Sequence, residues 1–224
     1  MVKYIFWHIQ GVRSLKKLLE GLSGWMSKCK VCLETKYEGL LDLLIDSPLC
    51  ASCLSKIKDI VKIEMIDGIE HLFLYEYNSF LREVIYLYKG RYNKDLFDVF
   101  TYKYKYFLKY KYRKYTFLCA PSNKEDDLKR SFNHVHQIAT SISSRVLSPF
   151  YKKKEWKQSD KKGEDRGNID DVIGVDENLI KGLKKVVIID DIYSTGNTIR
   201  TCVRQIKHKC DIKVLCICRN MLKK

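Results

Sequence analysis

The sequence lacks the features of a membrane-spanning protein and of a P-loop protein. None of its segments approaches the roughly 18 consecutive apolar residues that a transmembrane helix needs. Residues 1–10 are apolar and partly aromatic, but they carry no small-residue cleavage site of the kind that ends a signal peptide. A Gly-x-x-x-x-Gly-Lys-Ser/Thr loop is absent as well, which argues against a Walker-type nucleotide site. We therefore expect a cytoplasmic protein without a membrane span.

Acidic residues are the scarce charged class. The 224 residues include 42 Lys and Arg against 27 Asp and Glu, which gives a formal net charge of +15. Such an excess attracts phosphate-bearing partners over long range, and nucleic acid is the obvious candidate. A lysine-rich composition that reflects codon usage alone is the alternative. With 46% hydrophobic residues, the chain can bury a full core, so we expect one α/β domain with a small metal-stabilised appendage.

Two Cys-x-x-Cys pairs near the start have the spacing of a metal site. Cys29 and Cys32 form the first pair, and Cys50 and Cys53 form the second after seventeen intervening residues. This spacing predicts one structural Zn²⁺ held by four thiolates, with no coordination position left for catalysis. Buried or disulfide-bonded thiols are the alternative. The other cysteines have no ligand spacing and are expected in the core, namely Cys119, Cys202, Cys210, Cys216 and Cys218.

The stretch 186–198 is the most informative part of the sequence. Four consecutive aliphatic residues, 186–189, predict a strand buried on both faces, as in a parallel sheet. Asp190 and Asp191 follow where the chain is expected to turn, at the carboxyl end of the strand, where α/β sheets bind ligands. A run of small and polar residues then predicts a phosphate-binding turn and a helix over 199–208; the run is Ser194, Thr195, Gly196, Asn197 and Thr198.

Two carboxylates beside a phosphate repel it unless they contact hydroxyl groups of the ligand or a divalent metal that bridges to it. A sugar phosphate with a free diol satisfies this condition. An ordinary acidic turn before a capped helix is one alternative, and a Walker B strand is another.

Further elements follow from hydrophobic spacing. The pattern predicts helices over 12–24, over 80–88 with Ser79 as cap, and from Asp126 or Asp127 to near Val146, and strands over 69–77, 115–119 and 212–218. The turn after 115–119 is a second candidate anion site, made of Pro121, Ser122, Asn123 and Lys124. His134 and His136 do not share a helix face, so we expect no metal pair there. Residues 151–169 are charged and predict a mobile loop of the kind that covers active sites.

Residues 101–112 alternate tyrosine and lysine, which taken alone predicts a strand with one aromatic and one cationic face. Apolar residues from Leu96 to Leu108 at spacings of one, three and four favour a helix instead. On either geometry the lysines, the tyrosines and Arg113 can contact a phosphate backbone and stack bases. A solvated face of a core helix is an equally good interpretation, and we leave both open.

The acid pair and the loop 194–198 resemble the phosphoribosyl pyrophosphate (PRPP) loop of type I phosphoribosyltransferases. The resemblance implies that Asp190 and Asp191 hold the ribose hydroxyls, that the loop amides hold the 5-phosphate, and that Mg²⁺ accompanies PRPP. Together with the four cysteines, other motifs resemble the ComF competence family from Cys29 onward. These motifs are Lys89-Gly90, Pro121-Ser122, Arg130-Ser131-Phe132-Asn133, and Gln158 with Arg166-Gly167-Asn168, with Ser131 where the family has glycine.

This resemblance implies a zinc finger with its preceding helix over 1–60 and a phosphoribosyltransferase domain over 61–224, a Rossmann-like, mostly parallel sheet flanked by helices. Residues 121–124 would face the pyrophosphate, and Lys89, Arg130 and Asn133 would lie around the same cleft. Gln158, Arg166 and Asn168 would belong to a mobile flap, about 151–169.

The implied function is that of a cytosolic competence protein for natural transformation. It would bind PRPP with Mg²⁺ and handle incoming single-stranded DNA beside DNA-uptake machinery such as a competence helicase or an inner-membrane channel. Phosphoribosyl transfer is one activity to expect, although no residue stands out as a catalytic base. A nucleotide-salvage transferase acting on a free base and a non-catalytic DNA-binding factor regulated by PRPP are the alternatives.

Overall fold

The computed structural model describes residues 28–34, 36, 47–122, 127–128, 131–153 and 173–221. The chain divides into two compact units, Met1–Lys56 and Ile57–Lys224. The predicted helix over 12–24 lies outside the described residues. Among the helices that are described, none is long and apolar enough to cross a membrane.

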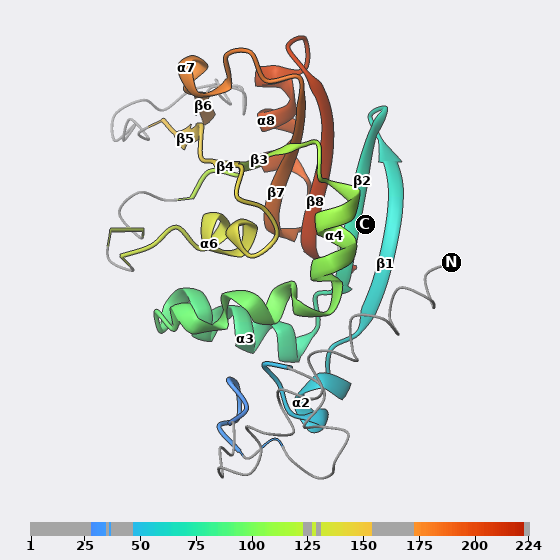
Figure 1. Ribbon diagram of the computed structural model, residues 1–224, viewed down its shortest axis with the longest axis vertical. Helices are drawn as coiled ribbons and strands as arrows, with labels where there is room; N and C mark the ends of the chain where they lie inside the picture. The colour runs from blue at the N-terminus through green and yellow to red at the C-terminus, as the bar shows by residue number, and fades with distance from the viewer. Residues whose placement is uncertain are drawn as a thin grey trace, which may run out of the picture. The chain divides into compact units, whose positions relative to one another are not determined.

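The larger unit is built on a six-stranded sheet with the strand order β1-β2-β8-β7-β3-β4 (Figure 1). β1 pairs with β2 in antiparallel fashion, and every other neighbouring pair in this sheet is parallel. The strands are β1 Asp59–Ile66, β2 Ile69–Glu76, β3 Thr116–Cys119, β4 Val146–Leu147, β7 Lys185–Tyr193 and β8 Asp211–Arg219. This is the mostly parallel, Rossmann-like α/β sheet predicted from the sequence.

Helices cover both faces of the sheet. Their bounds are α3 Ser79–Gly90, α4 Lys105–Lys111, α6 His134–Thr140, α7 Glu177–Ile180 and α8 Asn197–Ile206, with 3-10 helices η1 Lys94–Phe100 and η2 Tyr102–Tyr104. On one face, Val186 and Ile188 pack in the same cluster as residues of α8. Successive side chains of a strand point to opposite faces, so Val187 and Ile189 point to the other face, where α6 contacts β3 and β7.

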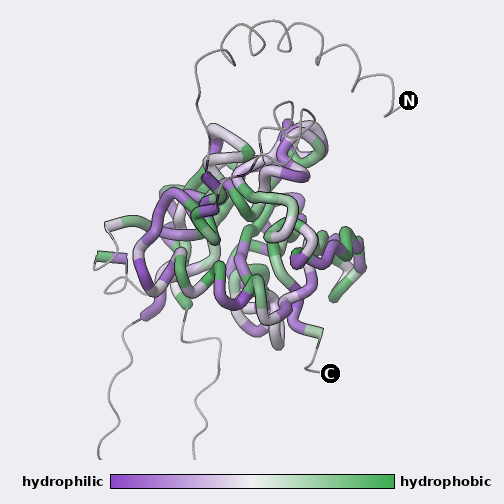
Figure 2. Tube along the Cα trace, turned by 90° about the horizontal axis from the view of Figure 1, so that it is seen from below, coloured by the Kyte–Doolittle hydropathy of each residue, from purple (hydrophilic) through white to green (hydrophobic). Residues whose placement is uncertain are grey.

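The aliphatic run 186–189 is fully buried, as predicted. Along the whole described chain, hydrophobic stretches alternate with hydrophilic ones (Figure 2).

The turn predicted directly after Ile189 was wrong. β7 continues to Tyr193, because Asp190 and Ile192 still pair with Cys216 and Cys218 of β8. The two acids are therefore strand residues, and the turn starts only at Ser194. The helix predicted after this turn begins at Asn197, two residues earlier than expected.

The continuous helix predicted from Asp126 or Asp127 to near Val146 was also wrong. Ser131 has a left-handed backbone (φ 62°), which interrupts a right-handed helix. Asn133 then caps a new helix, α6, by accepting a hydrogen bond from the His136 amide (2.8 Å). α6 ends at Thr140, and Val146 belongs to β4.

Three smaller predictions were resolved by the structure. α3 is capped by Asn78, whose side chain accepts from the Leu81 amide (2.9 Å), and not by Ser79. The Tyr/Lys segment is helical, as η2 followed by α4, so the strand alternative is excluded. The loop predicted from residue 151 starts later, because β5 (Phe150–Lys152) pairs in antiparallel fashion with β6 (Ile173–Val175).

Candidate functional site

The four predicted cysteine ligands of the N-terminal unit lie together. Their Sγ atoms are all within 4.8 Å of one another, and three of the four residues are buried while Cys32 is exposed. A tetrahedral Zn²⁺ with bonds of about 2.3 Å places its sulfur ligands roughly 3.8 Å apart. The Sγ atoms of Cys32 and Cys50 are separated by 3.6 Å, so the cluster has the dimensions of a structural metal centre.

Backbone amides support this centre. Cys50 caps α2 (Ala51–Ser55), and its Sγ accepts a hydrogen bond from the Cys53 amide (3.4 Å). Although burial raises the pKa of the Cys29 thiol, hydrogen bonds from the backbone of Cys32, Cys50 and Val31 lower it to about 6. Burial and hydrogen bonds with the neighbouring thiols instead raise the pKa of Cys53. Thiolates are the form that binds metal, so Cys29 ionises first, and a Zn²⁺ held by the four sulfurs would deprotonate the others.

In the larger unit, the sheet changes its winding direction between β7 and β3. The connection from β3 runs through α6 on one face to β4, whereas the connection from β7 runs through α8 on the other face to β8. In open α/β sheets such a switch point leaves a crevice at the carboxyl ends of the two strands, where ligands bind. Asp190 and Asp191 lie on β7 at this edge, and the Pro121-Ser122 turn follows β3 beside them.

The two acids have different electrostatic environments. Burial, together with the negative charge of Asp191, raises the pKa of Asp190 well above its ordinary range. Burial alone would also raise the pKa of Asp191, but the charges of Lys89 and His134 lower it below its ordinary value. The backbone amide of Asp191 donates to Asp190 Oδ1 (2.9 Å), which holds the Asp190 side chain against the backbone.

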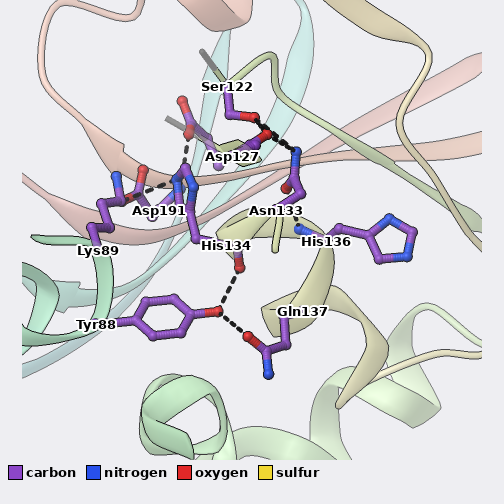
Figure 3. A network of polar contacts seen from close by, with 10 residues as sticks. Tyr88, Lys89, Ser122, Asp127, Asn133, His134, His136, Gln137 and Asp191 are labelled. Carbon is purple, nitrogen blue, oxygen red and sulfur yellow. Dashed lines mark hydrogen bonds and ion pairs between the residues drawn. The ribbon is translucent and has the colours of Figure 1, made fainter. Parts of the chain in front are cut away.

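Lys89 provides the cation that balances Asp191. It lies in the last turn of α3, and its Nζ forms an ion pair with Asp191 Oδ2 (Figure 3). The Asp191 side chain is 9% exposed and the Lys89 side chain 27% exposed, so the pair is largely shielded from water. Lys89 therefore lies beside Asp191, and its place around a PRPP cleft stays a prediction.

His134 is a residue of this site that the sequence analysis missed. Its Nε2 is 4.0 Å from Asp191 Oδ2, and the residue is buried. Tyr88 donates from its hydroxyl to the His134 carbonyl oxygen (2.8 Å), which ties the start of α6 to α3 (Figure 3). The sequence predicted of His134 only that it forms no metal pair with His136. One sequence signal could have identified His134 as a site residue. It comes directly after a helix cap, on a helix that follows the carboxyl end of a strand.

The predicted phosphate loop leads directly into the N-terminus of α8. Gly196 is the N-cap residue in a left-handed conformation (φ 75°), and the first helical hydrogen bond runs from the Arg200 amide to its carbonyl oxygen (2.9 Å). The amides of Asn197, Thr198 and Ile199 precede that bond, so they point out of the helix end as anion-binding groups do. Ser194 and Thr195 are exposed beside them.

Gly196 is required at its position for two reasons. Its positive φ is unfavourable for residues with a side chain. A Cβ atom would also lie 2.5 Å from Cζ of the Tyr193 ring, closer than packed atoms approach. The ring of Tyr193 therefore lies directly against the glycine and shapes the loop.

The Pro121-Ser122 turn is joined to the start of α6 by a small polar network. The side-chain nitrogen Nδ2 of Asn133 donates to Ser122 Oγ (2.8 Å) and to Asp127 Oδ2 (3.0 Å), and Ser122 Oγ donates to Asp127 (Figure 3). Because Asn133 also caps α6, it connects this turn to the helix that carries His134. Asn133 thus has a positioning role that the motif alone did not indicate.

The remaining predicted residues of the cleft and flap, namely Asn123, Lys124, Arg130, Gln158, Arg166 and Asn168, lie outside the described residues. Their roles stay predictions.

A cavity of about 490 Å³ opens beside Lys89, on the side of Ile192. Its lining includes Arg82 and the aromatic rings of Tyr77, Tyr86 and Tyr92. This volume lies in the range of small-molecule pockets.

Comparison with known proteins supports the family suggested by the motifs. No family model matches the chain. The competence protein ComFC of Bacillus subtilis (strain 168) is 22% identical over 204 residues, which cover 79% of this chain and 85% of that protein. The competence protein ComFC of Streptococcus pneumoniae (strain ATCC BAA-255 / R6) is 28% identical over 132 residues, or 59% of each chain. With the four-cysteine cluster, these similarities confirm that the chain resembles the ComFC competence proteins of the ComF family.

Proposed function

We propose that this protein acts in competence for natural transformation, where it binds PRPP with Mg²⁺ and handles incoming single-stranded DNA in the cytosol. The competence role is supported by the names of its two relatives. The PRPP site is supported by one observation above all: the paired acids at the switch point of the sheet lead, within a few residues, into the amides at the start of α8.

The residues present suit the parts of PRPP. Carboxylate oxygens of Asp190 and Asp191 accept hydrogen bonds from the ribose hydroxyls, and the amides of residues 197–199 donate to the 5-phosphate. Ser122 follows β3 beside the two acids, and by the family resemblance this segment would face the pyrophosphate. Mg²⁺ prefers oxygen ligands, which the two carboxylates and the phosphates offer, and it would neutralise pyrophosphate charge.

Phosphoribosyl transfer is the second candidate function, and the cavity beside Lys89 favours it. Transfer passes through a cationic ribosyl transition state, so it needs positioning and charge neutralisation more than a strong base. Tyr77, Tyr86 and Tyr92 can hold a planar acceptor next to the acid pair. A salvage transferase would take a free base there, whereas a competence protein would take a base of DNA or use PRPP only as a regulatory ligand.

Calorimetric titration with PRPP and MgCl₂ tests the binding site. We expect Asp190→Asn combined with Asp191→Asn to weaken binding at least about 100-fold, because several charge-assisted hydrogen bonds are lost. The matched control is Glu83→Gln with Asp95→Asn, two exposed acids on other elements, which should bind like the parent. Unchanged affinity in the Asp190/Asp191 variant would refute the site.

Pyrophosphate release separates the candidate activities. The parent is incubated with PRPP and Mg²⁺ alone, with single-stranded DNA, and with free purine or pyrimidine bases. Release that depends on DNA supports transfer to DNA, release with a free base supports salvage, and binding without release supports a regulatory ligand.

A further inference from the structure

The helix α4 presents aromatic side chains to solvent. Tyr106 is 68% exposed, Phe107 44% and Tyr110 70%, whereas Leu108 between them is fully buried. Tyr110 follows Tyr106 by four positions and Phe107 by three, and side chains at these spacings are neighbours on a helix, so the three rings form a single patch. Large aromatic groups gathered at a surface indicate a binding site more often than chance exposure.

A cationic groove adjoins this patch. A cavity of about 450 Å³ lies between the end of α4 and the turn before β4. Its lining includes the cations Lys109, Arg113 and Arg145 and the hydroxyls of Thr140, Ser143 and Ser144, and no acidic residue among those that the structure describes lines it. The sequence over 101–115 has six lysine or arginine residues and no aspartate or glutamate. The groove therefore suits a chain of phosphates.

The two arginines of the groove are held in place. The Arg113 guanidinium lies over the Tyr110 ring, 4.5 Å from its centroid, and its Nη1 donates to the Tyr110 carbonyl oxygen (3.1 Å). Arg145 donates from Nη2 to the Arg113 carbonyl oxygen. A guanidinium carries five N–H donors, so each arginine keeps donors for a phosphate after these contacts.

Other cations of this segment serve the fold instead. Lys103 pairs with Asp59, and Lys111 pairs with Glu70 (2.8 Å). The side chains of Lys109, Arg113 and Arg145 are exposed and surround the groove. Positive charge is thus gathered beside the aromatic patch at Lys109, Arg113 and Arg145.

We propose that single-stranded DNA binds along this surface, with bases stacked on Tyr106 and Tyr110 and phosphates at Arg113 and Arg145. Proteins that bind single strands without sequence preference combine aromatic rings, on which bases stack, with a basic groove that follows the phosphate backbone. Because β3 and β4 begin at this end of the sheet, the DNA surface and the acid pair lie at opposite ends of parallel strands. The inference rests on the DNA handling in the proposed function and is independent of the PRPP site.

Fluorescence anisotropy with a labelled oligothymidine of about 15 nucleotides tests the surface. We expect Tyr106→Ala with Tyr110→Ala to weaken binding at least about tenfold, since each stacked base contributes a measurable share of the affinity, and to leave the salt dependence unchanged. Arg113→Gln with Arg145→Gln should reduce the slope of log affinity against log salt by about 1.4, because each phosphate contact to a single strand contributes about 0.7.

Matched controls separate the effect of direct phosphate contacts from the effect of the protein's overall positive charge. Lys94→Gln with Lys181→Gln removes the same charge from exposed positions on other elements and should leave the slope nearly unchanged. Calorimetry with PRPP should give the parent affinity for all three variants. Thermal unfolding checks that each variant is folded. Photocrosslinking of the parent to 4-thiothymidine DNA tests the surface without any variant, and it should yield adducts at Tyr106 or Tyr110.

The outcomes distinguish this inference from the proposed function. If the parent binds the oligonucleotide but the aromatic variant binds equally well and crosslinks form elsewhere, the surface is wrong while DNA handling stands. If the parent binds no single-stranded DNA, both fail. A preference of more than tenfold for duplex DNA or for oligouridine would overturn the assignment to single-stranded DNA.

Discussion

The ion pair between Lys89 and Asp191 predicts a strong energetic coupling between the two residues. Removing one member of a fully buried pair costs about 3–5 kcal/mol, because the other charge is left without compensation. Here the Lys89 side chain is 27% exposed, and His134 lies 4.0 Å from the same carboxylate oxygen. Both facts reduce the penalty, so we expect Lys89→Met to destabilise the protein by about 2 kcal/mol. For a unit of this size, that corresponds to a decrease in Tm of about 4–8 °C.

A double-mutant cycle with Asp191→Asn measures this coupling by urea unfolding. The double variant leaves no unpaired carboxylate, so it should be more stable than Lys89→Met alone by about 1–2 kcal/mol. The folded-state pKa of Asp191 is lowered, so its contribution is present above the unfolded-state pKa of about 3.9 and is lost as the pH falls through the folded-state value. The coupling should therefore be full at pH 7 and decline below about pH 4. A coupling below about 0.5 kcal/mol at pH 7 would refute this electrostatic account.

Three further predictions concern the loop, the helix break and the metal. Gly196→Ala should lower PRPP affinity at least about tenfold and should reduce Tm more than Gly182→Ala does. Both glycines have positive φ, but of the two only Gly196 lies against a ring, that of Tyr193. Equal losses of Tm in the two variants would contradict this explanation. Ser131→Gly should raise Tm by about 1–3 °C in differential scanning fluorimetry by relieving its left-handed backbone, and Ser131→Ala, which keeps that strain, should give no increase. Purified protein should contain about one zinc per chain by atomic absorption, and Cys50→Ser should abolish it; protein purified without chelator that contains no zinc would contradict the assignment.

The sequence predicted the parts of the site that depend on local pattern. A run of buried aliphatic residues identifies β7, and the small residues after it identify the start of α8 to within two positions, because both signals lie within a few neighbouring residues. The four-cysteine cluster could also be predicted from the sequence, since metal-binding cysteines come in pairs with a characteristic spacing.

The contacts around Asp191 could not be predicted in the same way. Lys89 and His134 reach it from α3 and α6, so their positions depend on how the helices pack on the sheet and not on any local periodicity. The break at Ser131 was missed for a different reason. Serine has no strong preference against helix, and its left-handed backbone becomes evident only in the folded chain.

The unequal lengths of two neighbouring strands leave Asp190 and Asp191 without a strand partner on the β3 side. β3 has four residues and β7 has nine, and their last paired residues are Cys119 and Ile189. β7 therefore extends beyond its neighbour by the four residues from Asp190 to Tyr193, or about 13 Å. Extending β3 at its carboxyl end would fill this step with backbone and cover the acids without altering any of them. Insertions at this end of β3 should thus be far less tolerated than insertions in the connection that precedes it.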